Sequence, residues 1–149
     1  MGARSHCNIN FLLLVLLFSV LLSKCSSIRF GPVVVHVQND IEGYEVALDY
    51  HCFSDDDDLG HRMLHQGEEW HWKFRVIPGA TFFMCDMRWY DNWNYRWYDG
   101  KFEVYYANGL IGNRFNGFCG GNCQWSIRRD GAYLYRKDRR EWQRRGEWH

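Results

Sequence analysis

Apolar and polar residues alternate with a period of two along most of the chain, as is typical of strands that bury one face. In "YEVALDYHC", every second residue from Tyr44 to Cys52 is apolar, and the residues between them include acids and a histidine. The same alternation predicts strands in "VVVHVQN", "YEVALDYHC", "WHWKFRV", "TFFMCDMRW", "KFEVYY", "CQWSIRR" and "AYLYR". Asp130-Gly131 predicts a tight turn between the last two. No stretch has convincing helical periodicity, so we expect an all-β protein, an antiparallel β-sandwich of about seven to eight strands.

The N-terminus carries an apolar run, Phe11 to Leu22, after a weakly basic start. This run is too short to span a hydrocarbon core, which needs about 20 residues, and it has the length of the apolar part of a secretory signal peptide. Cleavage after Cys25 or after Ser27 fits the small residues that follow. We therefore expect residues 1–27 to be a signal peptide and the mature protein to be secreted, extracellular and not membrane-spanning.

The rest of the chain has the length of one domain. We expect the β-sandwich to occupy residues 28–136. Residues 137–149, "KDRREWQRRGEWH", alternate in charge and offer few apolar anchors. They predict a basic tail that trails from the last strand and is partly disordered.

Loss of the signal peptide changes the cysteine pattern. The chain has six cysteines, of which Cys52, Cys85, Cys119 and Cys123 remain after cleavage. In an oxidising compartment they predict two disulfides, with three possible connectivities. Cys119 and Cys123 are close in sequence, so we expect each of them to be bridged to one of Cys52 and Cys85, in an order that the sequence does not fix.

The stretch "HCFSDDDDLGHRMLHQGEEW", residues 51–70, concentrates charges and histidines. Its run of aspartates, Asp55 to Asp58, partly fits a calcium loop, but Leu59 and Gln66 stand where that loop needs oxygen ligands. His61 and His65 have the spacing of a zinc motif without its glutamate. We interpret the acidic run as a solvated loop between strands, and we expect no metal and no cofactor.

Other function classes find little support. The chain has no G-x-S-x-G motif, and a catalytic cysteine would leave an odd thiol, so we expect no enzyme. The C-terminal region is basic, but the mature domain is slightly acidic overall, which argues against nucleic-acid binding.

The segment "RWYDNWNYRWYDGK", residues 88–101, interleaves Trp and Tyr with Asp, Asn and Arg. Such side chains provide rigid, amphipathic contact area, as in a paratope or a platform for sugars. The alternative is that Trp89 and its neighbours continue a core strand and the other rings cap the sandwich. We expect the partner-binding residues to be Asp91, Trp93, Tyr95, Arg96 and Trp97.

The order of these motifs resembles the plant self-incompatibility protein family, the S-protein homologues. The resemblance runs over nearly the whole chain, through "VHVQND", "HCFSDDDDLG", "EEWHWKF", "TFFMCDMRW", "FEVY" and "CGGNCQWSIRRDGAYLY". It implies a secreted β-sandwich in which the acidic loop belongs to the scaffold.

The resemblance also implies a function. Founding members of the family are secreted by the stigma and trigger rejection of self pollen through a receptor on the pollen. We therefore expect a recognition ligand, a monomer, whose partner is a cell-surface receptor protein. The alternative from the aromatic segment is a secreted module that binds carbohydrate or cell wall.

Overall fold

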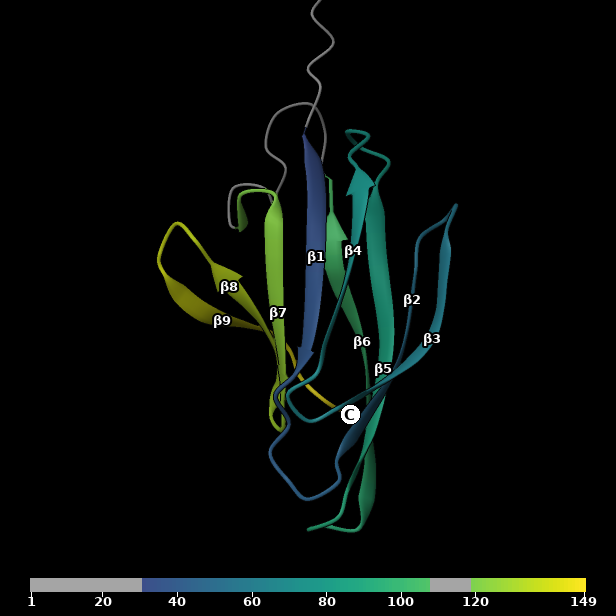
Figure 1. Cartoon of the computed structure of the whole chain (residues 1–149), viewed down its shortest axis with the longest axis vertical. Coiled ribbons are helices and arrows are strands. Elements are labelled where there is room, and N and C mark those ends of the chain that lie inside the picture. Colours follow the sequence, from purple (N-terminus) through teal and green to yellow (C-terminus); the bar gives the residue numbers. More distant parts are fainter. Residues whose placement is uncertain (1–30, 108–118) are drawn as a thin grey trace, which may run out of the picture.

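A computed structural model describes residues 31–107 and 119–149. The predicted signal peptide therefore lies outside the described residues. All regular elements described are strands (Figure 1). They are β1 (Pro32–Asn39), β2 (Ala47–Phe53), β3 (Asp58–His65), β4 (Glu69–Arg75), β5 (Phe82–Asp91), β6 (Arg96–Tyr106), β7 (Asn122–Arg128), β8 (Gly131–Arg136) and β9 (Glu141–Gly146).

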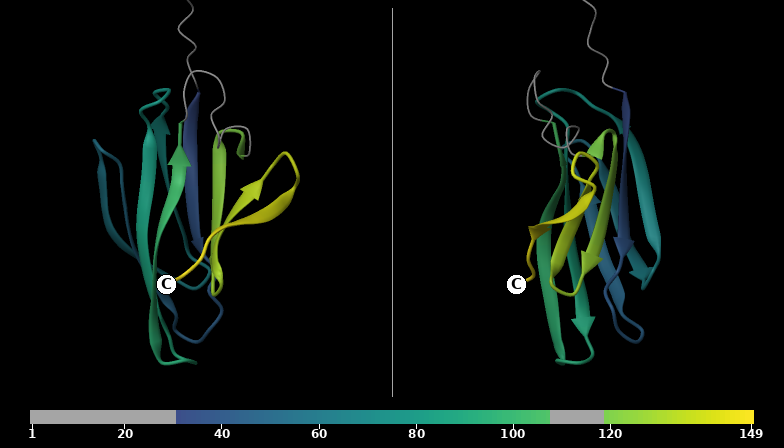
Figure 2. Two further views of the ribbon diagram at one scale, coloured as in Figure 1. Left: turned by 180° about the vertical axis from the view of Figure 1, so that it is seen from behind. Right: turned by 90° about the vertical axis from the view of Figure 1, so that its left-hand side faces the viewer.

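The strands form two sheets that pack into a sandwich, which confirms the predicted fold class. The five-stranded sheet has the order β4-β1-β7-β8-β9, and the four-stranded sheet has the order β3-β2-β5-β6. The long β5–β6 hairpin extends beyond the other strands at one end of the molecule (Figure 2). The end of β1 and the connection from β1 to β2 lie at this same end (Figure 1).

The apolar residues that alternate along the strands form the core. On β5, Phe83, Cys85, Met87 and Trp89 are all buried, while the residues between them face outward. The same holds along β1 and β2, and on β7 the alternation is broken only by Ser126, which is buried between Trp125 and Ile127. The indole N–H of Trp125 on β7 donates a 3.0 Å hydrogen bond to a carbonyl of β6 in the opposite sheet. Burying an indole with a partner for its N–H favours one fixed packing of the two sheets.

Two strands were not predicted, and both lie at sheet edges. Residues 58–65 form β3, which takes in the last residue of the acidic run that was predicted to be a loop, and only Leu64 on it is buried. The tail predicted to trail from the domain instead forms β9, and none of its six residues is fully buried. An edge strand is held by backbone hydrogen bonds to a single neighbour. When most of its side chains are in solvent, apolar and polar residues need not alternate along it.

The C-terminal residues also close the sandwich. Trp148 donates its indole N–H to the carbonyl of Arg128 at 2.8 Å and packs edge-on against Phe102. His149 donates its backbone N–H to the carbonyl of Asp99 on β6 at 2.9 Å. These contacts replace the disordered tail expected from the sequence.

One strand pair is parallel. β1 pairs with β4 in antiparallel register and with β7 in parallel register, from Val34 opposite Asn122 to Asn39 opposite Ile127. The five-stranded sheet is therefore mixed, although every other pairing in the two sheets is antiparallel.

Two disulfides form, but the expected pairing is wrong. The bonds join Cys52 to Cys85 and Cys119 to Cys123. Cys52 and Cys85 are directly opposite each other on β2 and β5, with Cα atoms 4.0 Å apart. Cys123 lies in the other sheet, and Gly120–Gly121, both with positive φ, let the chain turn back so that Cys119 reaches it. Glycine adopts such angles without steric cost.

Candidate recognition surface

The loop of the β5–β6 hairpin is the most exposed aromatic segment of the described chain. It comprises Asn92 to Tyr95 and is closed by the strand pair Asp91 and Arg96. The Asp91 carboxylate accepts hydrogen bonds from the backbone N–H of Trp93, at 2.9 Å, and from the side-chain amide of Asn94, at 2.7 Å. Aspartate favours turns because it can bond the backbone two residues ahead. This one side chain therefore fixes the shape of the loop.

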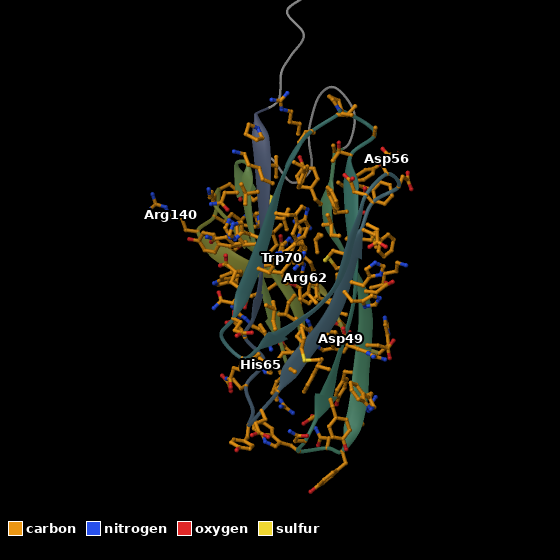
Figure 3. The ribbon with its side chains drawn as sticks, turned by 45° about the vertical axis from the view of Figure 1, so that its right-hand side comes forward. Asp49, Asp56, Arg62, His65, Trp70 and Arg140 are labelled. Carbon is orange, nitrogen blue, oxygen red and sulfur yellow. A yellow bond between two sulfur atoms is a disulfide. The ribbon has the colours of Figure 1, made fainter. Side chains whose placement is uncertain are left out.

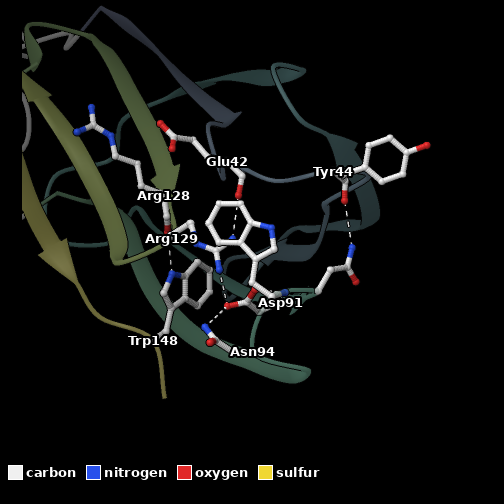
Figure 4. A network of polar contacts seen from close by, with 9 residues as sticks. Glu42, Tyr44, Asp91, Asn94, Arg128, Arg129 and Trp148 are labelled. Carbon is white, nitrogen blue, oxygen red and sulfur yellow. Dashed lines mark hydrogen bonds and ion pairs between the residues drawn. The ribbon is translucent and has the colours of Figure 1, made fainter.

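Asp91 is itself buried, with only 1% of its surface exposed, and it forms an ion pair with Arg129 (Figure 4). Burial alone would raise the pKa of Asp91. The hydrogen bonds from Arg129, the Trp93 backbone and Asn94, together with the Arg129 charge, outweigh burial and lower that pKa to about 2. The carboxylate is thus a stable anion inside the end of the sandwich.

Arg129 joins three separate segments. It lies in the β7–β8 turn, and its guanidinium stacks between the rings of Trp89 and Trp93, at 5.0 and 3.8 Å from their centroids. It also donates a 2.8 Å hydrogen bond to the carbonyl of Glu42, in the β1–β2 connection (Figure 4). Stacking uses the faces of the planar guanidinium and ion pairing uses the N–H groups at its edge, so one arginine can hold all three segments.

A second hydrogen bond joins the hairpin loop to the β1–β2 connection. The side-chain amide of Asn92 donates to the carbonyl of Tyr44 at 3.0 Å. Tyr44 is 78% exposed, and Trp93 and Tyr95 are 60% and 81% exposed. Tyr44, Trp93 and Tyr95 together are called the tip surface below. The tip surface presents exposed rings on a backbone that is held from beneath by Asp91 and Arg129.

The remaining predicted contact residues lie elsewhere on the hairpin. Trp97 is 59% exposed on the outer face of β6, next to Tyr90 and with the Arg88 guanidinium 5.5 Å above it. Arg96 stacks over the ring of Tyr98, 4.5 Å from its centroid.

The structure therefore separates the residues predicted from sequence. Asp91 does not offer a surface to a partner, because it is buried and saturated by donors, so its assignment as a contact residue is corrected. Trp89 is a core residue, fully buried. Two residues of the site, Tyr44 and Arg129, were not predicted. Nothing in the local sequence of Arg129 separates it from other turn arginines, since its partner lies 38 positions away.

The acidic loop lies at the opposite end of the molecule, where Asp56 is labelled (Figure 3). Its backbone is organised by Ser54, whose hydroxyl accepts hydrogen bonds from the N–H groups of Asp56 and Asp57 at 3.3 and 2.9 Å. Asp58 instead bonds His51 at 2.6 Å and the N–H of Gly60; these bonds lower its pKa. The aspartates thus serve different partners and do not converge.

A shallow groove of about 520 Å³ runs over the outer face of the four-stranded sheet. Two of the carboxylates that line it form ion pairs, Asp49 with Arg88 at 2.9 Å and Asp86 with Lys101 at 3.3 Å. No helix in the described part of the chain is long and apolar enough to cross a membrane.

The fold and site define a small disulfide-linked β-sandwich with aromatic side chains displayed at one end. Residues 34–148 match the model of the family described as plant self-incompatibility protein S1, and the chain belongs to that family. It is similar to S-protein homolog 29 of Arabidopsis thaliana, with 34% identity over 83% of this chain and 84% of the relative. It is 30% identical to Self-incompatibility protein S1 of Papaver rhoeas, over 90% of this chain and 89% of the relative.

S-protein homolog 2 of Arabidopsis thaliana is 32% identical over 72% of this chain, which spans 62% of that relative's length. No solved structure matches the chain.

Proposed function

We propose that the protein is a secreted recognition ligand that acts through a cell-surface receptor protein and has no catalytic activity of its own. Its membership of the S1 family and its likeness to Self-incompatibility protein S1 support this role. Two disulfides suit a protein that works in an oxidising, extracellular environment. The process in which we propose that this ligand acts is self-recognition between pollen and pistil.

The receptor contact is proposed at the tip surface. The observation that carries this assignment is the set of exposed rings of Tyr44, Trp93 and Tyr95 above the Asp91–Arg129 ion pair. Trp and Tyr at the centre of an interface commonly contribute about 2 kcal/mol or more each. A loop already fixed in shape loses little conformational entropy when a partner binds it.

Trp97 extends the proposed contact along the outer face of β6, whereas Arg96, next to it in the strand, lies on the opposite face over Tyr98. Trp97 shares the outer face of the four-stranded sheet with Tyr90, its strand partner. A partner that covers the hairpin loop and continues over this face would bury both aromatic groups. A substitution of Trp97 would test this extension separately from the tip surface.

The test uses the protein as secreted from a plant expression host, with binding to intact pollen or protoplasts of the source plant measured by a fluorescent label. We expect Trp93→Ala with Tyr95→Ala to weaken binding at least tenfold. Trp142→Ala is the matched control, because Trp142 is 40% exposed and lies on β9, away from the hairpin. A folded double variant that binds like the wild type would contradict the assignment.

A carbohydrate- or cell-wall-binding role is the second candidate, favoured by the same exposed rings, since aromatic faces stack on sugars. It predicts binding to purified wall polysaccharide or on a glycan array, lost with the same double substitution. The receptor hypothesis predicts instead that protease treatment of the cell surface abolishes binding and that polysaccharide does not compete.

A further inference from the structure

Two histidines far apart in the sequence meet on the outer face of the five-stranded sheet. His36 on β1 is the direct strand partner of His71 on β4, and their ring centroids are 5.1 Å apart. Glu69 precedes His71 by two positions on the same strand, so its side chain lies on the same face. The register of β1 and β4, continuous from Pro32 to Gln38, thus brings three potential ligands together.

The ligand atoms already converge. His36 Nδ1 lies 2.6 Å from Glu69 Oε1, and His71 Nδ1 lies 3.7 Å from the same oxygen. One donor atom from each of the three residues lies within 4.8 Å of the others. Metal–ligand distances near 2.1 Å in a tetrahedral zinc site place the donor atoms about 3.4 Å apart. Side-chain rotations that move the donor atoms by about 1–2 Å would therefore suffice to form such a site, with no change of the backbone.

We propose that His36, Glu69 and His71 bind a divalent transition-metal ion of the zinc and copper type, with water completing the coordination. Two imidazoles and one carboxylate suit Zn²⁺ and Cu²⁺, whereas Ca²⁺ and Mg²⁺ prefer all-oxygen sites. The proposal departs from the sequence-based expectation of no metal. That expectation considered His61 and His65, which are four positions apart in sequence, whereas His36 and Glu69 are 33 positions apart.

The bound ion would link β4 to β1. β4 is the outermost strand of its sheet and is hydrogen-bonded to β1 alone. A metal held by one ligand from β1 and two from β4 would resist separation of this edge. Because the unfolded chain does not hold the three ligands together, the ion would stabilise the folded state selectively.

The protein contains a natural control for this site. His51 and His61 are likewise strand partners, on β2 and β3, and their rings stack 4.4 Å apart. Asp58 contacts His51 at 2.6 Å. Within the described residues, however, only the group of His36, Glu69 and His71 brings three donor atoms within 4.8 Å. The proposal assigns the metal to that group and not to the His51 pair.

The test measures Zn²⁺ binding by calorimetry on the untagged protein, and Co²⁺ absorption as a report on coordination. We expect one Zn²⁺ per chain and a melting temperature that rises with Zn²⁺. His71→Ala should lower the affinity at least tenfold and remove the thermal shift, and Glu69→Gln should weaken binding to a smaller extent. The His71 side chain is 62% exposed, so its removal leaves the core intact.

His61→Ala should leave Zn²⁺ binding unchanged. Loss of binding in His61→Ala with retention in His71→Ala would overturn the proposal and move the site to the other sheet. Absence of any Zn²⁺ heat or thermal shift in the wild type would overturn it as well, and would leave His36–Glu69 as an ordinary hydrogen-bonded pair. Should His61→Ala or His71→Ala fold poorly, Glu69→Gln tests the same site, because weaker Zn²⁺ binding in this variant places the ion at the group of His36, Glu69 and His71.

Discussion

Asp91 and Arg129 form an ion pair that joins the tip of the β5–β6 hairpin to the β7–β8 turn. The carboxylate is 1% exposed, and its oxygens also accept hydrogen bonds from Trp93 and Asn94 within the loop. The guanidinium reaches on to the carbonyl of Glu42. One buried pair therefore determines the position of three loops at the end where the exposed rings lie.

The first prediction is that Asp91→Asn destabilises the fold. The substitution leaves the Arg129 charge without its counterion and weakens the hydrogen bonds to the loop. Removing one member of a buried pair commonly costs about 3 kcal/mol. Urea denaturation should show a decrease in the free energy of unfolding of that order. Asp55→Asn, in the exposed acidic loop, is the control, and an equal loss in both variants would contradict the role given to Asp91.

The second prediction concerns acid. The pKa of Asp91 is about 2 in the folded protein, below the value of about 3.9 for an unperturbed aspartate. The folded state therefore holds the proton less tightly, and this stabilisation is complete above about pH 4 and is lost as the pH falls toward 2. The difference in unfolding free energy between wild type and Asp91→Asn should be constant near neutral pH and shrink between about pH 4 and 2. A difference in unfolding free energy that persists unchanged at pH 2 would contradict the lowered pKa of Asp91.

The third prediction separates the two disulfides. Cys52–Cys85 spans 33 positions and Cys119–Cys123 spans four. In the chain-entropy model, closing these loops stabilises the fold by about 4 and about 2 kcal/mol respectively. Replacing both cysteines of the first pair by alanine should thus lower the melting temperature more than replacing both of the second. Peptide mapping of the secreted protein should recover these two pairs, and a Cys52–Cys123 peptide would refute the connectivity.

The strands that the sequence predicts are those with one buried face. β5 is an example, since burial of Phe83 through Trp89 leaves a period of two that can be read directly. β3 and β9 could not be found this way, because an edge strand with most side chains in solvent has no such period. Trp148 looks like part of a polar tail in sequence. It is an anchor only because the carbonyl of Arg128 accepts its N–H.

The site was predictable in part for the same reason. Tryptophan and tyrosine at the hairpin loop could be placed on the surface, because loops between strands lie there. The burial of Asp91 could not be predicted, because it depends on Arg129, which only the packing of the two sheets brings near. The predicted cysteine pairing was wrong for a similar reason, since the register between β2 and β5 decides which thiols are opposite each other.

The last prediction uses the backbone of Tyr95 to separate stability from binding. Tyr95 has φ of 53°, in the left-handed region that glycine adopts freely and that costs a bulky residue on the order of 1 kcal/mol. Tyr95 is 81% exposed, so its ring adds little to folding. Tyr95→Gly should therefore raise the free energy of unfolding by about 1 kcal/mol, whereas Tyr95→Ala, which keeps the strain, should not. Both variants should lose binding to the cell surface, since both remove the ring. A stabilised Tyr95→Gly protein that still binds fully would show that Tyr95 is not a contact residue.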